Sequence, residues 1–264
     1  MYDFFKLDGI KTVSTLAILS CFIIVSSFFL LSLPFFFSVA LIATIGIILL
    51  AFSYYFFHNH MFEKFLDSLH YLKQYMQDFS VPKHVRKEVM KILGDVEGKT
   101  IFEYGSGVGT LTLDLAKMTG NKGKVFASDI SKGEIAVLNN RLSQNDILNV
   151  TSIHDPSHSE RISPLVSSFD IFLSIESLGY AKDSASIVHE AFTRMPVGGK
   201  ICIVEYVDLY KIVPNTAWLS NLDSVYRMFK KNGFVVRVVK KHGWFWNYLY
   251  IYGVKGKHVR LPRL

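Results

Sequence analysis

Two acids and a group of glycines carry the clearest chemical signal in this sequence. Glu103 ends a short apolar run, and three glycines follow it at alternate positions. These are Gly105, Gly107 and Gly109. Glycines let a backbone turn tightly and let a ligand approach the main chain, and N–H groups at the start of a following helix can face that ligand. Asp129 ends the next apolar run, about 20 residues later, where a carboxylate accepts hydrogen bonds from ribose hydroxyls. The pattern therefore predicts a ligand that contains a ribose.

The spacing of the glycines separates two kinds of cofactor. A dinucleotide-binding fingerprint requires its third glycine at position 110, which is Thr110 here. The run Glu103–Gly109 instead resembles the first motif of the class I S-adenosylmethionine-dependent methyltransferases. Its context agrees, because a strand is expected before it, a helix over Thr110–Met118 after it, and an acid-ended strand over Lys124–Ser128 next.

This resemblance covers about Val81 to Lys257 and implies S-adenosylmethionine as the cofactor. It implies that Glu103 holds the methionine part, that Asp129 binds the ribose and that Ile130 packs on the adenine. The residues that the resemblance assigns to cofactor binding are Glu103, Tyr104, Gly105, Ser106, Gly107, Gly109, Asp129, Ile130, Asp155 and Ser174.

Asp155 resembles the acid that meets the adenine amino group in this family, although His154 and Asn149 are alternatives for that role. The segment Arg194–Lys200 resembles the family's R-x-L-x-P-G-G-K turn, with the proline shifted by one position.

Apolar runs alternate with helical patterns along the rest of the chain, which predicts an α/β fold with a parallel sheet covered on both faces. Further strands are expected over Val150–Ile153, Phe169–Ile175, Lys200–Tyr206, Phe234–Val239 and Tyr248–Val254. Further helices are expected over Lys83–Leu93, Lys132–Asn145, Ser184–Met195 and Leu219–Asn232. A short link joins the last two strands, so we expect them to pair antiparallel. The predicted domain is a Rossmann-like class I methyltransferase sheet.

The acceptor side of the predicted site is less defined. Its candidate polar groups are Glu176, Tyr180, Glu205 and Tyr206, with His154 beside them. The fourth strand ends in Ser174–Ser177, without the Asn/Asp-Pro-Pro-Tyr/Phe motif of methylases that act on exocyclic amines of bases, which argues against nucleic acid as a partner. The two cysteines lie inside apolar runs and indicate neither a disulfide framework nor a metal cluster.

The N-terminal segment predicts a membrane anchor. No charged residue occurs from Thr12 to Phe57, and these 46 residues would form a helix of about 69 Å, enough for two crossings of a hydrocarbon core about 30 Å thick. Pro34 marks the turn, so the spans are residues 12–33 and 35–57 of a transmembrane hairpin, residues 1–57. S-adenosylmethionine is made in the cytosol, so we expect both ends of this multi-pass chain, and its catalytic domain, on the cytoplasmic side.

Two further segments point to the membrane. Residues 58–80 alternate apolar and charged positions with helical spacing, which predicts an amphipathic juxtamembrane helix that lies on the bilayer or on the domain. The net charge is +7, and no Asp or Glu follows Asp223. We expect the basic stretch Lys240–Arg263, which overlaps a basic tail at 258–264, to meet anionic head groups. The aromatic residues Trp244–Tyr248 suit a membrane interface, single-stranded nucleic acid or hairpin packing, of which the interface ranks above nucleic acid.

The sequence therefore predicts a membrane-anchored S-adenosylmethionine-dependent methyltransferase. Its expected acceptor is membrane-resident: a lipid head group, an isoprenoid or a quinone. One alternative is a tethered methyltransferase that acts on a soluble small molecule, protein or RNA. Another is a non-catalytic S-adenosylmethionine-binding membrane adaptor.

Overall fold

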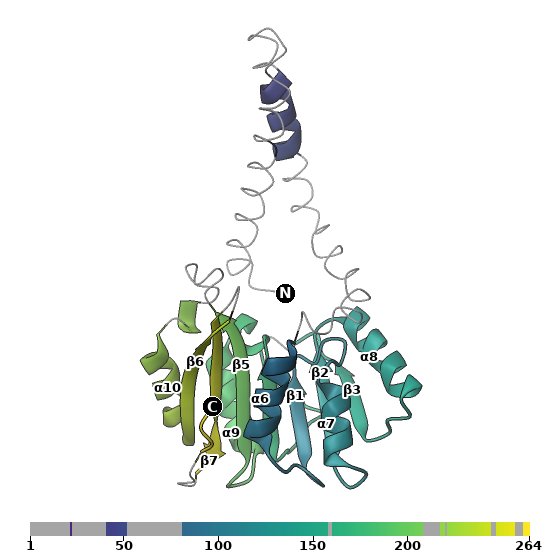
Figure 1. The fold of residues 1–264 in the computed structure, drawn as a ribbon, viewed down its shortest axis with the longest axis vertical. Helices are drawn as coiled ribbons and strands as arrows, with labels where there is room; N and C mark the ends of the chain where they lie inside the picture. The colour runs from purple at the N-terminus through teal and green to yellow at the C-terminus, as the bar shows by residue number, and fades with distance from the viewer. Residues whose placement is uncertain are drawn as a thin grey trace. The chain divides into compact units, whose positions relative to one another are not determined.

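The computed structural model describes residue 22 and residues 41–51, 81–157, 160–207, 217–219, 221–243, 247–256 and 261–264. The chain divides into two compact units, Phe4–Ser68 and the larger Leu69–Leu264 with Met1–Asp3. Each unit is described by itself. All labelled helices and strands belong to the larger unit (Figure 1).

In the smaller unit the described residues are Phe22 and residues 41–51, and both are helical. Residues 41–51 carry no charge, and Leu41, Ile47, Ile48 and Leu50 are each more than half exposed. No helix among the described residues is both long enough and apolar enough to span a bilayer. Apart from these residues, the predicted spans 12–33 and 35–57 and the predicted helix 58–80 lie outside the described part of the chain.

One seven-stranded sheet forms the centre of the larger unit. Its strands are β1 (Thr100–Tyr104), β2 (Lys124–Asp129), β3 (Val150–His154), β4 (Ile171–Ile175), β5 (Lys200–Val207), β6 (Phe234–His242) and β7 (Asn247–Lys255). They lie in the order β3-β2-β1-β4-β5-β7-β6. The first five are parallel, and β7 pairs antiparallel with both β5 and β6. The predicted α/β sheet and the antiparallel pairing of the last two strands are therefore confirmed.

Helices cover both faces of this sheet (Figure 1). One face packs against α6 (Lys83–Leu93), α7 (Thr112–Thr119) and α8 (Lys132–Gln144). The other face packs against α9 (Ser184–Arg194) and α10 (Leu222–Lys231), with two short 3-10 helices, η2 (Leu178–Tyr180) and η3 (Ala217–Leu219). The alternation of side chains along each strand separates the two cores, since Ile101 of β1 packs on the α6 side and Phe102 on the α9 side.

Helix α6 begins at the edge of the sheet where the parallel strands end, which we call the carboxyl edge. The ring of His84 in its first turn lies 5.1 Å from the ring of Tyr248, and Tyr248 pairs with Tyr206 near the end of β5. At the other end of the helix, the carbonyl of Leu93 accepts a hydrogen bond from the ammonium of Lys200, the first residue of β5. The helix therefore runs antiparallel to β5.

Two helices start later than the sequence predicts. Helix α7 begins at Thr112, and Thr110 and Leu111 belong to a turn. Arg141 of α8, itself buried, stabilises this turn by donating a 2.7 Å hydrogen bond to the Val108 carbonyl. The predicted helix over Leu219–Asn232 divides into η3 and α10, because Asn221 caps α10 by accepting a hydrogen bond from Ser224 N.

The fourth strand also starts later than predicted, at Ile171. The preceding residue, Asp170, binds the start of β1 through its side chain, which accepts a hydrogen bond from Thr100 N at 2.9 Å. Phe169, which the sequence placed in the strand, is buried in the core on the α9 side.

Among the described C-terminal cations, Lys240 and Lys255 lie at opposite edges of the sheet. Lys240 pairs with Leu249 near the carboxyl edge, whereas Lys255 pairs with Phe234 at the opposite edge. The Lys255 ammonium donates to the carbonyls of Phe192 and Met195 at the end of α9, at 2.6 and 2.7 Å. The expectation that Lys240–Arg263 forms a single membrane-facing stretch is therefore corrected, because antiparallel strands carry successive cations to opposite ends of the sheet.

Other parts of the C-terminal prediction lie outside the described residues, namely 244–246 and 257–260. The described end of the chain packs on the sheet. Leu261 and Leu264 contact the core on the α6 side, and the Pro262 carbonyl accepts a hydrogen bond from the Tyr252 hydroxyl at 2.7 Å.

Candidate cofactor-binding site

Three acids follow one another across the carboxyl edge of the sheet. Glu103 lies near the end of β1, Asp129 ends β2, and Asp155 directly follows β3. These strands are neighbours in the order β1-β2-β3, and Asp155 N donates to the Asp129 carbonyl at 2.9 Å. Parallel strands bring their ends to one edge, and ligands of open α/β sheets bind there.

Glu103 is almost fully buried, and its Oε2 accepts a 2.6 Å hydrogen bond from the Thr112 hydroxyl at the start of α7. Burial raises the pKa of Glu103 to about 8; the Thr112 hydrogen bond opposes this rise, and the charge of Asp129 adds to it. No ion pair joins Glu103 to a described cation. A cationic ligand group would stabilise the ionised form of this carboxylate.

The glycine loop is held by the end of β2. Gly105 N and Ser106 N both donate to the Ser128 carbonyl, at 2.8 and 3.0 Å. Gly107 N donates to Asp129 Oδ2 and Ser131 N donates to Asp129 Oδ1, each at 2.8 Å. Asp129 therefore stabilises the loop as well as lying where the sequence predicts ribose recognition.

Gly105 has two reasons to be glycine. Its φ is +80°, a conformation that residues with a side chain rarely adopt. A Cβ at this position would also lie 1.8 Å from the hydroxyl oxygen of Ser177 and 2.3 Å from its Cβ. The loop after β4 therefore packs directly against the glycine loop.

Two buried polar atoms near these loops have no hydrogen-bond partner among the described residues: Ser106 Oγ and Asp155 Oδ2. Asp155 Oδ1 is bound by Ser157, through its N–H at 3.0 Å and its hydroxyl at 2.7 Å. Such orphaned atoms are expected where a polar ligand binds. Together with the Glu103 carboxylate, they fit a ligand that presents hydroxyl, amine and cationic groups.

The two alternatives to Asp155 are placed differently. Asn149 lies before β3, and its amide donates to the carbonyls of Ala116 and Gly120 around the end of α7. The His154 side chain is exposed, with Nε2 3.2 Å from the Ile130 carbonyl. Ile130 itself is half-buried, directly after Asp129. This arrangement favours Asp155 over Asn149 as a group facing the ligand.

On the acceptor side, Glu176 lies in the loop after β4 and Tyr180 ends η2, and both are half-buried. Glu176 has a φ of +54°, and its N–H donates to the Val204 carbonyl of β5 at 2.8 Å. A positive φ in a residue other than glycine costs energy and often marks a functional position. Ser174 is fully buried, and its hydroxyl accepts a hydrogen bond from Leu178 N at 3.2 Å, so it supports this loop.

The side chains of Glu205 and Tyr206 lie on opposite faces of β5, near the end of the strand. Glu205 is buried and accepts a hydrogen bond from Gly179 N at 2.9 Å. Burial raises its pKa to about 8, against the lowering effect of backbone hydrogen bonds from the loop after β4. Tyr206 packs edge-on against Tyr248 in the core on the α6 side, with ring centroids 5.0 Å apart. Glu205 thus positions the acceptor-side loop, and Tyr206 belongs to the core.

The sequence did not single out three residues that shape this site: Thr112, Ser177 and Arg141. Each acts through a tertiary contact that the linear sequence does not display, with Glu103, Gly105 and the Val108 carbonyl respectively. A hydroxyl at the start of the helix after a glycine loop is the one local signal that could have indicated Thr112.

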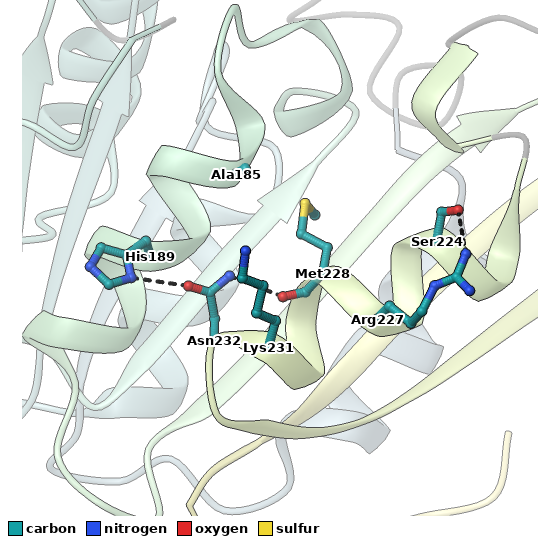
Figure 2. A pocket seen from close by; sticks show the side chains of 7 residues that line it. All are labelled: Ala185, His189, Ser224, Arg227, Met228, Lys231 and Asn232. Atoms are coloured by element: carbon teal, nitrogen blue, oxygen red, sulfur yellow. Dashed lines mark hydrogen bonds between the residues drawn. The ribbon is translucent and has the colours of Figure 1, made fainter.

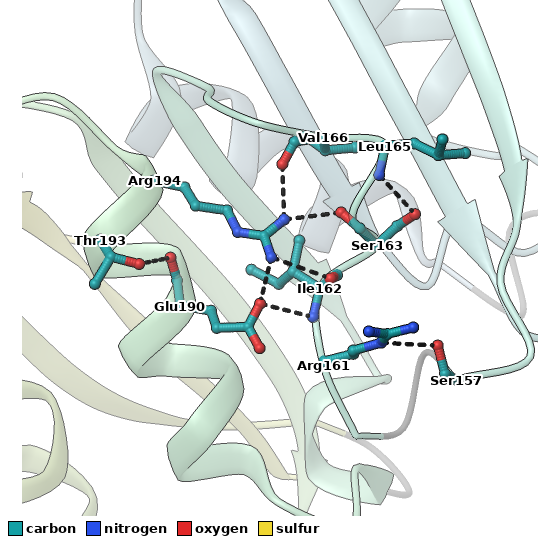
Figure 3. Close-up of polar contacts among 9 residues, drawn as sticks. All are labelled: Ser157, Arg161, Ile162, Ser163, Leu165, Val166, Glu190, Thr193 and Arg194. Atoms are coloured by element: carbon teal, nitrogen blue, oxygen red, sulfur yellow. Dashed lines mark hydrogen bonds and ion pairs between the residues drawn. The ribbon is translucent and has the colours of Figure 1, made fainter.

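The turn Arg194–Lys200 has a structural role at the other edge. Arg194 donates to the carbonyls of Ser163 and Val166 at 2.8 and 2.7 Å, and forms an ion pair with Glu190 at 2.6 Å (Figure 3). These contacts fix the segment that leads into β4.

A pocket between α9 and α10 contains none of the predicted site residues (Figure 2). It is lined by Ala185, His189, Ser224, Arg227, Met228, Lys231 and Asn232. His189 Nδ1 lies 3.0 Å from Asn232 Oδ1 across the pocket, and Arg227 Nη2 donates a hydrogen bond to Ser224 Oγ. Its polar groups are thus partly occupied by one another.

A family of known proteins matches the part of the chain that contains this site. Residues 95–246 match a family model described as a methyltransferase domain, which covers the acid-and-glycine site and strands β1 to β6. The demethylmenaquinone methyltransferase of Lactococcus lactis subsp. lactis (strain IL1403) is 23% identical over 189 residues, 60% of this chain and 74% of that protein.

A ubiquinone biosynthesis O-methyltransferase of Hydrogenovibrio crunogenus (strain DSM 25203 / XCL-2) is 30% identical over 115 residues, which are 44% of this chain and 46% of that protein. Among solved structures, a SAM-dependent methyltransferase from Aquifex aeolicus superposes with a TM-score of 0.53 at 20% identity. The superposition covers 69% of this chain and 98% of the other, so the two share a fold.

Proposed function

The chain belongs to the methyltransferase family whose domain it contains, and we propose that this enzyme is anchored in a membrane and methylates a membrane-resident acceptor. The enzyme is an S-adenosylmethionine-dependent methyltransferase. The proposed acceptor is a lipid head group, an isoprenoid or a quinone. The proposed anchor is a hairpin with spans at residues 12–33 and 35–57, which keeps the catalytic domain on the cytoplasmic side.

When bound, S-adenosylmethionine would supply a methyl group on a cationic sulfonium; an acceptor atom would bond to that methyl carbon in line as the carbon–sulfur bond breaks and the neutral thioether leaves. Residues of this chain hold and orient the cofactor. Glu103 offers a buried carboxylate to its cationic methionine part, Asp129 accepts from the ribose, and Asp155 offers its unpartnered Oδ2 to the adenine amino group. Alignment of the reacting atoms supplies most of the rate gain in such a displacement.

Replacing Asp129 with alanine should weaken cofactor binding by about 1–3 kcal/mol, because the ribose hydroxyls and two backbone N–H groups lose a charged acceptor. Asp129→Asn keeps one carbonyl acceptor and should lose less. Calorimetric titration with S-adenosylmethionine measures both. Equal affinity in the wild type and the alanine variant would show that this carboxylate does not recognise the ribose.

Glu176 and Tyr180 are the proposed acceptor-side groups, since both lie in the segment that follows β4 at the carboxyl edge. A general base is required only for an acceptor that is a poor nucleophile, such as a hydroxyl. Glu176 is the better placed of the two for that role, because it directly follows the strand and its backbone is held in a strained conformation.

Three observations support a membrane anchor and a membrane-resident acceptor. The 46 residues from Thr12 to Phe57 contain no charge. The described helical residues 41–51 expose large apolar side chains. The two curated relatives are named for methylation in the biosynthesis of menaquinone and ubiquinone, which are membrane-soluble molecules.

The path of the chain into the catalytic domain is the observation that carries the proposal furthest. The described part of the domain begins at Val81, just before α6, and α6 begins at the carboxyl edge. The N-terminal segment is therefore connected to the domain at the same edge as the cofactor-binding acids. A chain that enters the domain at the edge carrying the site suits an acceptor that stays in the bilayer.

The test is methyl transfer by the full chain in detergent, with S-adenosylmethionine labelled on its methyl group and a total lipid extract as the source of acceptor. Label should enter the organic phase with the wild type and remain at background with Asp129→Ala. Label that enters only aqueous material would overturn the membrane-resident acceptor while leaving the methyltransferase activity established.

A further inference from the structure

We propose that the carboxyl edge of the catalytic domain docks on an anionic lipid surface through a group of cations that we call the basic rim. The basic rim consists of Lys83, Arg86 and Lys87 of α6 with Lys240 and Lys241 of β6. This inference rests on the proposed membrane anchor and adds the surface that orients the domain on the bilayer.

Helix α6 carries a group of cations at its amino end. It carries Lys83, Arg86 and Lys87 in its first two turns and no acid in its first turn. Cations at the amino end of a helix oppose the helix dipole. An anionic surface facing this end would offset that cost.

The packing of α6 leaves Lys83 and Lys87 exposed and Arg86 half-buried. Val85 and Val89 are fully buried against the sheet, whereas Lys83 and Lys87, four residues apart on one face, are exposed. The one acid of the helix, Glu88, forms a 2.7 Å ion pair with Lys241. Glu88 is thus engaged by a cation of β6, and this ion pair fixes the end of β6 beside α6.

Lys240 extends the basic rim along the carboxyl edge. It is exposed, and it lies in the cross-strand row that includes Leu249 of β7 and Glu205 of β5. The basic rim therefore borders the same edge that carries the acids of the cofactor site and Glu176.

A tether alone leaves the orientation of the domain undecided. The 23 residues 58–80 separate the uncharged run from Val81, and a chain of that length can span up to about 80 Å when extended. Attraction between cations and an anionic surface acts only within roughly 8 Å at physiological salt. The basic rim can thus hold a domain that the tether already keeps close, with the acceptor side facing the head groups.

An anionic bilayer is a better occupant than nucleic acid. The proposed anchor ties the chain that enters the domain at this edge to a lipid surface, whereas no feature of the described residues near the rim selects bases. Phosphate head groups would complement the positive charge of the rim. In the test below, protection of the rim lysines from acetylation by RNA but not by lipid would favour nucleic acid instead.

The experiment measures the reactivity of lysines in the full chain, reconstituted in nanodiscs of phosphatidylcholine alone or mixed with phosphatidylglycerol. An uncharged amine-acetylating reagent and mass spectrometry report each lysine. We expect acetylation of Lys83, Lys87 and Lys240 to fall several-fold in anionic nanodiscs only, and about 0.5 M salt to restore it. Internal controls at the opposite edge, which should not change, are the exposed Lys99, Lys117 and Lys122.

A triple variant tests cooperation within the rim. Lys83→Gln, Arg86→Gln and Lys87→Gln together should remove the protection of Lys240, whereas the matched change of Lys99, Lys117 and Lys122 to Gln should leave it intact. Equal acetylation in neutral and anionic nanodiscs would overturn the inference, and so would protection by RNA but not by lipid. A chain that fails to enter nanodiscs of either kind would instead overturn the proposed anchor.

Discussion

Gly105→Ala is expected to reduce the affinity for S-adenosylmethionine at least 100-fold in a protein that still folds. The left-handed backbone costs a residue with a Cβ roughly 1–2 kcal/mol. The new Cβ would also lie 1.8 Å from the Ser177 hydroxyl oxygen and must displace the loop after β4 or the glycine loop itself. Either movement alters the surface that holds the cofactor. Calorimetric titration measures the loss.

Two variants separate the causes of this effect. Gly198→Ala imposes a comparable φ of +86° where no atom lies within 4 Å of the new Cβ, so it should leave cofactor affinity unchanged. Adding Ser177→Gly to Gly105→Ala removes the clash and should recover part of the affinity. If Gly105→Ala alone binds the cofactor as tightly as the wild type, the contact between the two loops has no part in binding.

Glu103→Gln is expected to abolish a release of protons that accompanies cofactor binding. Burial raises the pKa of Glu103 to about 8, so the ligand-free protein holds a proton at neutral pH. The cationic groups of the cofactor stabilise the carboxylate and displace that proton. Affinity should therefore rise as pH increases from 6 to about 8 in the wild type, and should change much less in the variant.

The same shift has a defined sign for stability. The unfolded chain releases the Glu103 proton near its ordinary pKa of 4.5, and the folded protein near 8. Between pH 4.5 and about 8 the folded protein binds more protons than the unfolded chain. The free energy of unfolding without cofactor therefore falls as pH rises through this range, by about 1.4 kcal/mol for each pH unit. Glu205 contributes with the same sign, since burial raises its pKa to about 8 as well.

Calorimetry in buffers of different ionisation enthalpy measures the protons released on binding, and denaturant unfolding at pH 5.5 and 8.5 measures the change in stability. Glu205→Gln is the matched control, because it should reduce the pH dependence of stability without removing the proton release. If the Glu103→Gln variant releases as many protons on cofactor binding as the wild type, the cationic part of the cofactor does not lie against Glu103.

Much of the fold follows from local patterns. Helix α6 has the predicted bounds, Lys83–Leu93, because Pro82 precedes it and its apolar positions have helical spacing. The acids at the strand ends, Glu103 and Asp129, were also predictable, since each follows a mostly apolar run. These features depend on neighbours in the chain, which the sequence displays directly.

The remaining features depend on contacts between distant segments. Lys240 and Lys255 are close in sequence, yet the antiparallel pairing of β6 and β7 places them at opposite edges. Glu205 resembled a candidate catalytic acid until its hydrogen bond with Gly179, 26 residues away, assigned it to the support of a loop. The start of α7 at Thr112 likewise depends on Arg141 of another helix.

The position of β7 has a consequence for how the chain is made. During synthesis β5 and β6 emerge from the ribosome before β7, although β7 lies between them in the sheet. Until β7 emerges, β5 presents an open edge, and α10 with β6 cannot join the sheet. Open strand edges pair readily with other chains. The domain therefore completes its sheet late, long after the apolar N-terminal run has been synthesised. A chaperone that shields the open edge of β5 would act in that interval.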